Sequence, residues 1–434
     1  MQKVKVFKFG GASMSTGEGV KAVTSIIRDF GGERLLVVVS AIGKTTNALE
    51  ELTAHYMSGQ FDNMMQCYNQ VKRNHFDLAL ELFGDPKHLV FFHLEQSFFH
   101  LLRKIEESPS NSYDFEYDRI VSTGEIVSSQ ILNHYLLYAG LRNQWFDARK
   151  LIITDASFRD AKVDWILSGQ AIKKALLPYL APTEGSTKPG IVLTQGFLGG
   201  TTQGFSATLG REGSDYSAAI LAYSLDAQEV VIWKDVAGLL NADPKHFENT
   251  QLIQNISYQE AIELSYYGAT VIHPKTLKPL NAKNIPLRVK SFLNPTQPGT
   301  IIDRTSRNDS KIPSFILKFN QMLISIFPKD FSFIAEQNLS RIFSDFAKNG
   351  VKINLMQNSA LSFSVCYDFD KIKSPGLIRD LQANFNIRYN TNLTLITVRH
   401  YDQADLNKLL EGKKVMLEQK NRTTLQLVVK EGSN

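Results

Sequence analysis

The feature that most constrains the fold is a short apolar segment near the N-terminus that lies between two segments with helical spacing. In Leu35–Ser40 every residue before the final serine is aliphatic, and Lys3–Phe9 is predicted to be a second strand ahead of it. Gly19–Phe30 and Thr45–Met57 carry apolar residues at the spacing of a helix. Strands with continuous apolar runs that alternate with helices are typical of parallel sheets covered on both faces. We therefore expect an α/β fold built on a mainly parallel sheet.

The composition indicates a globular chain of several domains. Its 434 residues are 43% apolar and 21% charged, so a large core is expected. No stretch approaches the roughly 18–20 apolar residues of a membrane span, and the first residues lack the apolar core of a secretory signal. Cys67 and Cys366 form no CxxC pair, which argues against a disulfide framework and against a cysteine-based zinc site. We expect a cytoplasmic location, which is reducing, and no membrane partner.

The net charge of the chain is +5, and the whole excess lies beyond Pro313. There the basic residues are dispersed, with no run longer than the pair Lys413–Lys414. Nucleic-acid binding is typically accompanied by a clustered basic patch. We therefore expect no nucleic-acid partner.

Residues 60–115 depart from the alternating pattern. Phe61–Phe83 and Lys87–Glu107 are predicted to be two helices rich in histidine and phenylalanine, and we interpret them as a helical insertion. A further helix is expected at Ile126–Ala139, directly after Glu125.

A proline-rich segment, Asn294–Pro313, predicts a domain boundary. Beyond it, shorter elements predict a β-α-β-β order that occurs twice, as in two small α+β units of the split βαβ type. The expected elements are Ser314–Phe327, Asn338–Lys348, Val351–Gln357, Ala360–Tyr367, Gly376–Ala383, Asn392–Arg399, Ala404–Leu410, Lys414–Glu418 and Thr423–Val429.

The first candidate for chemistry is the loop after the first strand, Lys8-Phe-Gly-Gly11. Gly10 and Gly11 allow the backbone to approach an anion closely, and Lys8 adds a full positive charge. A tight turn without a ligand is the alternative for this loop alone. A similar polar loop, Ser40–Thr46, follows the second strand. Its Gly43-Lys44-Thr45 matches only the end of the motif GxxxxGK[ST], because Val38 stands where the first glycine is needed. This excludes a P-loop NTPase. Together the two loops predict a phosphate-binding cleft at the C-terminal edge of the sheet.

Two later blocks place charged residues at expected helix starts. Glu125, in Ser122-Thr-Gly-Glu125, suits either a substrate ammonium or the dipole of the following helix. In Gly210-Arg-Glu-Gly-Ser-Asp215, Arg211 suits a bidentate contact with a carboxylate. Ser214 and Asp215 in the same block equally suit a helix cap. The residues alone leave these alternatives open.

The strand Glu229–Trp233 is followed by Lys234 and Asp235 and, further on, by Lys245. An acidic residue with two nearby lysines suits nucleotide or metal contact, and a solvated charged loop is the alternative.

The histidines show no metal-binding pattern. His88 and His93 are not spaced for one helical face, and no HExxH motif occurs. We therefore expect no metal-ligating side chains. A GxSxG nucleophile motif is also absent from the sequence.

Seven blocks in order resemble the aspartate kinases of the amino-acid kinase superfamily. They are KFGGAS, SAIGKTTNALEEL, STGE, TQGF, TLGREGSD, WKDVAGLLNADP and GATVIHPKTLKPL. The resemblance implies a catalytic amino-acid-kinase domain at residues 1–303, a linker at 304–312, and a pair of ACT-like regulatory units at 313–434. It also implies a monofunctional protein, with no fused homoserine dehydrogenase, and a homodimer formed through the ACT-like units.

The implied reaction is phosphoryl transfer from ATP, with Mg²⁺, to the side-chain carboxylate of L-aspartate. The product is 4-phospho-L-aspartate, the first intermediate of lysine, threonine and methionine synthesis. A carboxylate with a pKa near ~4 is already ionised at neutral pH and needs no general base. The resemblance assigns catalysis to Lys8 and Asp215, aspartate binding to Thr46, Glu125, Phe197, Arg211 and Ser214, and ATP binding to Gly10, Gly11, Ser40, Lys234, Asp235 and Lys245.

The sequence departs from the family's pattern on the nucleotide side. Ala12 and Lys234 stand where the family usually has threonine, Lys245 where it has arginine, Leu240 where tyrosine is common, and Thr270 where lysine is common. The alternatives are a kinase of glutamate or acetylglutamate, and an amino-acid sensor with weak catalysis. The STGE and GREGSD blocks favour the aspartate kinase.

Overall fold

The computed structural model describes residues 3–180, 190–269, 272–330, 332–401 and 409–432. The chain divides into two compact units. The first comprises Met1–Leu239, Leu252–Ile262 and Ile272–Ser306, and the second comprises Leu240–Gln251, Glu263–Val271 and Arg307–Asn434. The two short segments that join the second unit had been expected in the first domain.

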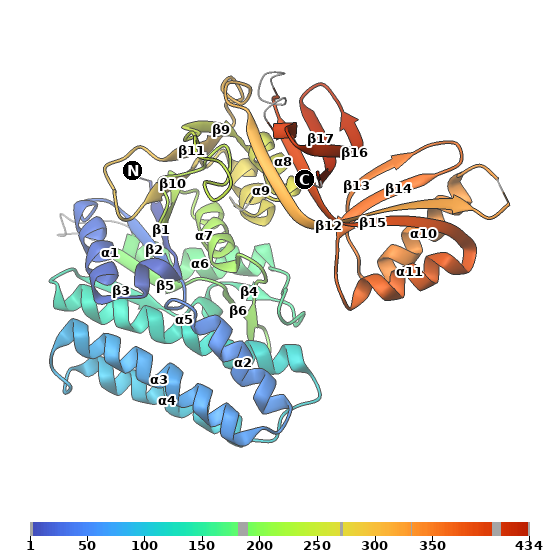
Figure 1. Ribbon diagram of the computed structural model, residues 1–434. Helices are drawn as coiled ribbons and strands as arrows, with labels where there is room; N and C mark the ends of the chain where they lie inside the picture. The colour runs from blue at the N-terminus through green and yellow to red at the C-terminus, as the bar shows by residue number, and fades with distance from the viewer. Residues whose placement is uncertain (1–2, 181–189, 270–271, 331, 402–408, 433–434) are drawn as a thin grey trace. The chain divides into compact units, whose positions relative to one another are not determined.

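A large, mostly parallel sheet forms the centre of the first unit (Figure 1). In the described residues its strand order is β3 (Asn143–Phe146), β5 (Ile191–Gln195), β2 (Leu35–Val39), β1 (Lys5–Phe9), β8 (Glu229–Lys234), β10 (Leu287–Ser291), β11 (Thr300–Asp303) and β9 (Asn255–Ser257). All neighbouring pairs in this order are parallel except β10 and β11. The predicted α/β fold is confirmed.

Side chains alternate between the two faces of this sheet, and this alternation places Lys8. Phe7, Phe9, Val37 and Val39 belong to a core that also contains residues of the helices α1 (Gly17–Asp29) and α5 (Tyr113–Tyr138). Lys8 lies between Phe7 and Phe9, so its side chain leaves from the opposite face. On that face α7 (Gly213–Ser224) contacts β1, β2 and β8.

The helical insertion forms an additional layer. The helices α3 (Phe61–Phe83) and α4 (Leu89–Glu106) pack on each other, on α5 and, for α3, on α2 (Thr45–Met57), as Figure 1 shows in blue and cyan. The helix α3 ends at Gly84, whose φ of 66° is a conformation that favours glycine. Tyr68 and Phe98 contribute to the buried seam between α3 and α4, with ring centroids 6.1 Å apart.

The remaining elements of the first unit surround the sheet ends. A small sheet contains β4 (Ile153–Thr154), β6 (Leu198–Thr201) and β7 (Ser206–Thr208). The other helical segments are η1 (Gly11–Met14), η2 (Ala148–Lys150), α6 (Trp165–Leu180) and α9 (Pro274–Lys283), with α8 (Tyr258–Tyr267) crossing into the second unit. None of the helices that the structure describes has the length and apolar character that a membrane-spanning segment requires.

The second unit is built on one antiparallel sheet. Its described strands have the order β13 (Ile353–Asn358), β14 (Phe363–Asp368), β12 (Ser314–Pro328), β15 (Phe385–Arg399), β17 (Thr424–Glu431) and β16 (Lys413–Lys420). The helices α10 (Glu336–Lys348) and α11 (Lys373–Asn384) contribute Ile342, Phe346, Leu377 and Leu381 to a core with Met322 and Val365. Small α+β units were expected here, and the structure adds that they share a sheet.

The two halves of this antiparallel sheet are nested rather than consecutive. The strands β12 and β15 run through both halves, and their mutual register shifts near Gln321, where it pairs with Leu393. Asn320 and Asn392, next to this point, have φ values of 55° and 56°. Everything between them forms an inner half with α10 and α11, while the strand ends beyond them form an outer half with β16 and β17. The helix expected at Ala404–Leu410 falls largely outside the described residues.

Candidate active site

Three strand ends meet at the C-terminal edge of the parallel sheet. The Ser40 amide donates to the Phe9 carbonyl over 3.1 Å, and the Gly196 amide donates to the Val39 carbonyl over 2.8 Å. The Gly43 amide donates to the Gly11 carbonyl over 3.0 Å. The loops that follow β1, β2 and β5 are therefore connected to one another by backbone hydrogen bonds.

Gly11 is required by the close approach of the first two loops. A Cβ atom at Gly11 would lie 2.6 Å from the Ala41 carbonyl oxygen and 3.0 Å from that of Gly43. Both contacts are with backbone, so a larger side chain would push the loops apart. At Gly10 a Cβ atom would lie 3.7 Å from Lys8 Nζ. A backbone without side chains therefore lies beside the lysine, which is the arrangement that a phosphate group needs.

Lys8 is held by an ion pair with the first turn of α7. Lys8 Nζ lies 2.7 Å from Asp215 Oδ1, and both side chains are nearly buried. Gly213 and Gly196 let α7 approach the loop after β5, because a Cβ atom at Gly213 would lie 2.5 Å from Phe197 Cδ2 and one at Gly196 would lie 2.5 Å from Ser214 Cβ. Asp215 is therefore a positioning partner of Lys8.

Glu125 does not open a helix, which corrects the expectation from the sequence. It lies in the middle of α5, which begins at Tyr113 and ends at Tyr138. The glycine in Ser122-Thr-Gly-Glu125 has a packing role. A Cβ atom at Gly124 would lie 2.9 Å from Thr45 Cγ2 and 3.1 Å from Leu49 Cδ1. The glycine lets α5 pack closely on α2, and this brings Glu125 into the cavity beside Thr46. A contact with the helix dipole is excluded for Glu125 by its position.

The carboxyl group of Glu125 is buried and incompletely satisfied. Its exposed fraction is 3%, and Oε2 has no hydrogen-bond partner in the described part of the chain. Burial raises the pKa of Glu125 to about 8, against the opposing effects of the Lys8 charge and a hydrogen bond from the Ala41 backbone. A buried acceptor without a partner, inside a cavity, suits a ligand that brings an ammonium group.

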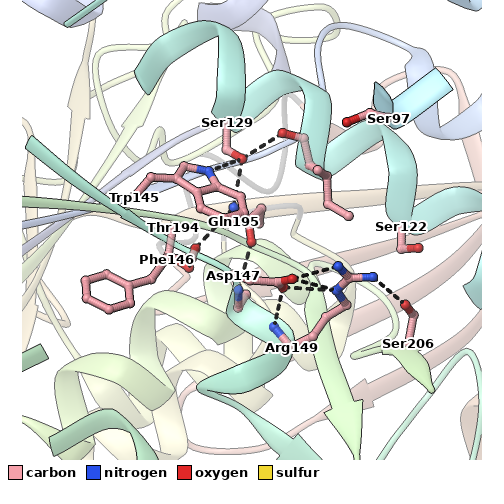
Figure 2. Close-up of polar contacts among 12 residues, drawn as sticks. Ser97, Ser122, Ser129, Trp145, Phe146, Asp147, Arg149, Thr194, Gln195 and Ser206 are labelled. Carbon is pink, nitrogen blue, oxygen red and sulfur yellow. Dashed lines mark hydrogen bonds and ion pairs between the residues drawn. The ribbon is translucent and has the colours of Figure 1, made fainter. Parts of the chain in front are cut away.

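A polar network fixes α5 against the ends of β3 and β5 (Figure 2). Ser129 Oγ accepts hydrogen bonds from Trp145 Nε1 over 2.9 Å and from Gln195 Nε2 over 2.8 Å. Gln195 Oε1 accepts from the Ala148 amide over 2.8 Å. Gln195 is fully buried with both ends of its amide used, so the loop that begins at Gly196 starts from a fixed point.

Phe197 adopts a left-handed conformation that its neighbours impose. Its φ is 68°, which is uncommon for a residue other than glycine. The Phe197 amide donates to Ser217 Oγ over 2.9 Å, and its carbonyl accepts from the Leu209 amide over 2.9 Å. These two bonds hold the residue at the wall of the cavity.

Arg211 lies at the rim of the cavity in the loop before α7. Its side chain is exposed, and within the residues that the structure describes its guanidinium forms no ion pair. The following residue, Glu212, has a φ of 53° and accepts a hydrogen bond from the His273 amide over 2.9 Å. The loop is thus anchored at Glu212, while Arg211 remains available to a carboxylate.

A cavity of about 490 Å³ lies at this edge of the sheet. Of the residues proposed from the sequence, the structure brings together Lys8, Gly11, Ser40, Thr46, Glu125, Phe197, Arg211, Ser214, Asp215 and Lys234. Gly10 adjoins Lys8 without lining the cavity, and Asp235 is exposed just after β8. Lys245 belongs to the second compact unit, and Thr270 lies outside the described residues, so their roles stay predictions.

The sequence did not reveal Tyr117 and Arg159 as lining residues. Arg159 has a φ of 66°, its guanidinium lies 4.4 Å from the centre of the Tyr117 ring, and it pairs with Glu50 over 2.9 Å. Asp118 positions this loop, because its Oδ2 accepts from the Arg159 amide over 3.0 Å. Burial raises the pKa of Asp118 to about 6, and hydrogen bonds from Thr208 oppose that shift. No local signal marks Arg159, since its partners are far away in the sequence.

The family model of the amino acid kinase family matches residues 3–291. The chain belongs to this family. Among its relatives, the chloroplastic aspartokinase 3 of Arabidopsis thaliana is 33% identical over 386 residues, which cover 86% of this chain and 66% of that protein. The lysine-sensitive aspartokinase 3 of Escherichia coli is 28% identical over 409 residues, which cover 92% of this chain and 87% of that protein.

Solved aspartokinase structures resemble this amino acid kinase along nearly its whole length. Escherichia coli aspartokinase III in complex with aspartate and ADP has a TM-score of 0.80 and 26% identity, covering 98% of this chain and 96% of that chain. The same enzyme in complex with lysine and aspartate also has a TM-score of 0.80. Within the amino acid kinase family, the chain is an aspartokinase homologue.

Proposed function

We propose that the protein is an aspartate kinase, which transfers the terminal phosphoryl group of ATP to the side-chain carboxylate of L-aspartate and forms 4-phospho-L-aspartate. One observation carries the proposal: the side chains of Lys8, Glu125 and Arg211 line the same cavity. A dicarboxylic amino acid needs a partner for its ammonium group and one for its α-carboxylate, and these residues supply both beside a lysine. The relatives support the same substrate, since one solved structure holds aspartate with ADP.

In this proposal the two ends of aspartate are bound by opposite charges. Glu125 accepts the α-ammonium, which gives its unpaired Oε2 a donor, and Arg211 holds the α-carboxylate by two parallel hydrogen bonds. Thr46, Phe197 and Ser214 complete the wall around the side chain. The side-chain carboxylate then points toward Lys8.

The reaction requires positioning and charge neutralisation rather than a base. The attacking carboxylate is ionised at neutral pH, so proton removal contributes nothing to the barrier. Two anions must approach each other, and a cation at the transferring phosphoryl group lowers the energy of that encounter. Lys8 supplies this charge, and Asp215 keeps its ammonium in place over 2.7 Å.

The proposed nucleotide contacts are residues at or after the ends of β1, β2 and β8, together with Lys245. The Gly10–Gly11 backbone suits phosphate groups because it carries no side chain beside Lys8, whose Nζ would lie 3.7 Å from a Cβ atom at Gly10. Two of the proposed contacts, Ser40 and Asp235, directly follow β2 and β8, and Lys234 is the last residue of β8. We propose Lys245 as a further contact. Mg²⁺ would neutralise phosphate charge, with phosphate oxygens and water as its main ligands, because it takes few ligands from protein.

We also propose a domain organisation, a place in metabolism and a location for the protein. Residues 1–303 would form the catalytic domain, 304–312 a linker, and 313–434 a regulatory region of paired ACT-like units that joins two subunits in a homodimer. The product would enter lysine and threonine synthesis. Two cysteines without a disulfide are compatible with the proposed cytoplasmic location.

A coupled assay of ADP release tests the function directly. The purified protein is given ATP and Mg²⁺ with L-aspartate, L-glutamate or N-acetyl-L-glutamate in parallel. We expect turnover with aspartate that exceeds turnover with the other two acceptors by at least tenfold. A preference for glutamate or acetylglutamate would show that the protein is a different kinase of the same family. Binding of aspartate without any ADP release would favour an amino-acid sensor.

A further inference from the structure

A cluster of three potential metal ligands lies between α2 and α3, apart from the residues that line the catalytic cavity. Glu51 and His55 are one helical turn apart on α2, and Cys67 is on α3. One ligand atom from each residue lies within 4.8 Å of the other two. Glu51 Oε1 and His55 Nε2 are 3.8 Å apart. In a tetrahedral zinc site, metal–ligand distances of roughly 2.0–2.3 Å place two ligand atoms only slightly closer together than Glu51 Oε1 and His55 Nε2 are here.

The orientation of His55 provides a second, independent observation. His55 Nδ1 lies 2.7 Å from Gln60 Oε1, which also accepts a hydrogen bond from Asn63 Nδ2 over 3.1 Å. A carbonyl oxygen only accepts, so Nδ1 carries the hydrogen. In the neutral ring the lone pair is then on Nε2, which is the nitrogen that faces Glu51. Histidine ligands of metals are fixed in this way, by a hydrogen bond from the nitrogen that does not bind the metal.

The accessibility of the three side chains suits a bound ion. Cys67 is half-buried and forms no disulfide, and His55 has a side-chain exposed fraction of 23%. Glu51 has a side-chain exposed fraction of 67%, so it can rotate toward the other two ligands without rearranging the core. An ion can therefore enter from solvent, and one coordination position remains for water.

Although the sequence pattern predicts no metal-ligating side chains, we propose that Glu51, His55 and Cys67 bind a zinc ion, with water as the fourth ligand. One sulfur, one nitrogen and one oxygen donor suit a borderline-soft divalent cation, whereas Mg²⁺ and Ca²⁺ prefer sites made of oxygen atoms. The site is independent of the Mg²⁺ that accompanies ATP. Binding displaces the thiol proton of Cys67 to solvent and leaves a zinc-bound thiolate.

The zinc ion would connect α2 to α3 across their short junction. Thr45 and Thr46 form the first residues of α2, and Thr46 lines the catalytic cavity. A link near the other end of α2 therefore restrains the helix that carries Thr46. The proposal assigns the insertion a structural role in holding that helix, and it does not depend on which amino acid is phosphorylated.

Cobalt absorption tests the site, because cobalt bound to a thiolate absorbs in the near ultraviolet. The full-length protein, freed of metal by a chelator and kept reduced, is titrated with Co²⁺. Because Cys67 and Cys366 are the only cysteines in the sequence, the band can be assigned to one residue. We expect saturation at about one equivalent, displacement by Zn²⁺, and loss of the band in Cys67→Ser. The matched control Cys366→Ser should keep the band, since Cys366 is buried in the second unit.

Two further variants separate ligation from folding. His55→Gln should weaken Co²⁺ binding at least tenfold, and Gln60→Ala should weaken it by about 10–100-fold, as removal of outer partners of metal ligands does. Circular dichroism checks that each variant is folded. A protein without a thiolate band, or with a band that persists in Cys67→Ser, would overturn the proposal. Zinc binding that is unchanged in both Cys67→Ser and His55→Gln would place the metal elsewhere and would also overturn it.

Discussion

Lys8 on β1 and Asp215 on α7 form a nearly buried ion pair, with Nζ and Oδ1 2.7 Å apart. The pair joins the end of a central strand to the first turn of α7. The exposed fractions of the two side chains are only 10% and 5%. The proposed catalytic lysine therefore also has a structural role, and its substitution should have two separable consequences.

We predict that Lys8→Met lowers turnover by at least ~10²–10³, because a cation at the transferring phosphoryl group is lost. It should also lower the free energy of unfolding by roughly 3–5 kcal/mol, since Asp215 is left buried without its partner. The double variant Lys8→Met with Asp215→Leu should regain much of the stability and none of the activity. Lys5→Met, three residues earlier on β1, is the matched control and should keep turnover. Activity above about a tenth of wild type in folded Lys8→Met would contradict the assignment.

Arg211→Ala should raise the KM for aspartate strongly and the KM for ATP little. The guanidinium is exposed at the rim, so its loss should leave stability unchanged while the substrate carboxylate loses its partner. An unpaired charge in a binding site costs about 2–5 kcal/mol. Steady-state kinetics with each substrate varied in turn measure both constants. Equal increases in the two KM values would show that Arg211 does not bind aspartate.

The pKa of Glu125, raised to about 8 by burial, predicts how aspartate binding depends on pH. In the free protein at pH 7 the carboxyl group is mostly protonated, and an ammonium ligand favours its ionised form. Binding of aspartate should therefore release a proton, and the KM for aspartate should fall as the pH rises toward 8. Calorimetry in buffers of different ionisation enthalpy measures the release. Absence of proton release at pH 7 would contradict the prediction.

The same carboxyl group predicts the pH dependence of stability. Its folded pKa is raised from 4.5 to about 8, so its contribution is fully present below 4.5 and is lost as the pH rises through 8. Glu125→Gln has no such loss, so its stability relative to wild type should increase over this range. Urea denaturation at several pH values measures the difference. A difference that stays constant with pH would show that Glu125 is ionised throughout.

Gly124→Ala should lower turnover by separating α5 from α2. The added methyl group would lie 2.9 Å from Thr45 Cγ2, and the buried, β-branched threonine has little freedom to move. Gly169→Ala in α6 is the matched control, because nothing lies within 4 Å of a Cβ atom there. That control should increase stability by about 0.5–1 kcal/mol and leave activity intact. Similar behaviour of the two variants would show that Gly124 has no packing role.

Lys234→Thr should weaken ATP binding by about 1–3 kcal/mol, as the loss of a charged hydrogen bond does. Lys234 is the last residue of β8 and lines the cavity at the sheet edge where the loop after β1 begins. Lys245→Ala, tested in parallel, asks whether the second predicted lysine contributes as well. An unchanged KM for ATP in Lys234→Thr would show that this lysine does not contact the nucleotide.

Much of the site could be predicted because its residues lie in the last positions of apolar strands or directly after them. Lys8, Gly11, Ser40 and Lys234 all lie at strand ends, and parallel strands bring such ends to one edge. From the sequence, Glu125 was expected at the start of a helix, where a carboxylate complements the helix dipole. The packing of Gly124 on α2 is a tertiary contact that overrides this local preference, and a single sequence carries no signal for it.

Arg159 and the first half of β15 could not be predicted for a similar reason. Arg159 is positioned at the cavity by a hydrogen bond from its amide to Asp118, which lies on another element. Residues 385–391 include several exposed polar side chains and lack the apolar run that marked other strands. This segment is a strand because β12 lies beside it, with Ile326 opposite Ile387.

The shared strands β12 and β15 also bear on how the second unit can evolve. Gln321 lies opposite Leu393, so the chain enters and leaves the inner half at neighbouring points of one sheet. A module whose two ends lie side by side can be duplicated, exchanged or lost while the gap that it leaves stays small enough for a tight turn to close. The inner half is therefore one continuous excursion of the chain. Its substitutions remain coupled to the outer half where Leu323, Leu355 and Cys366 share a core with Leu393, Leu395 and Val428.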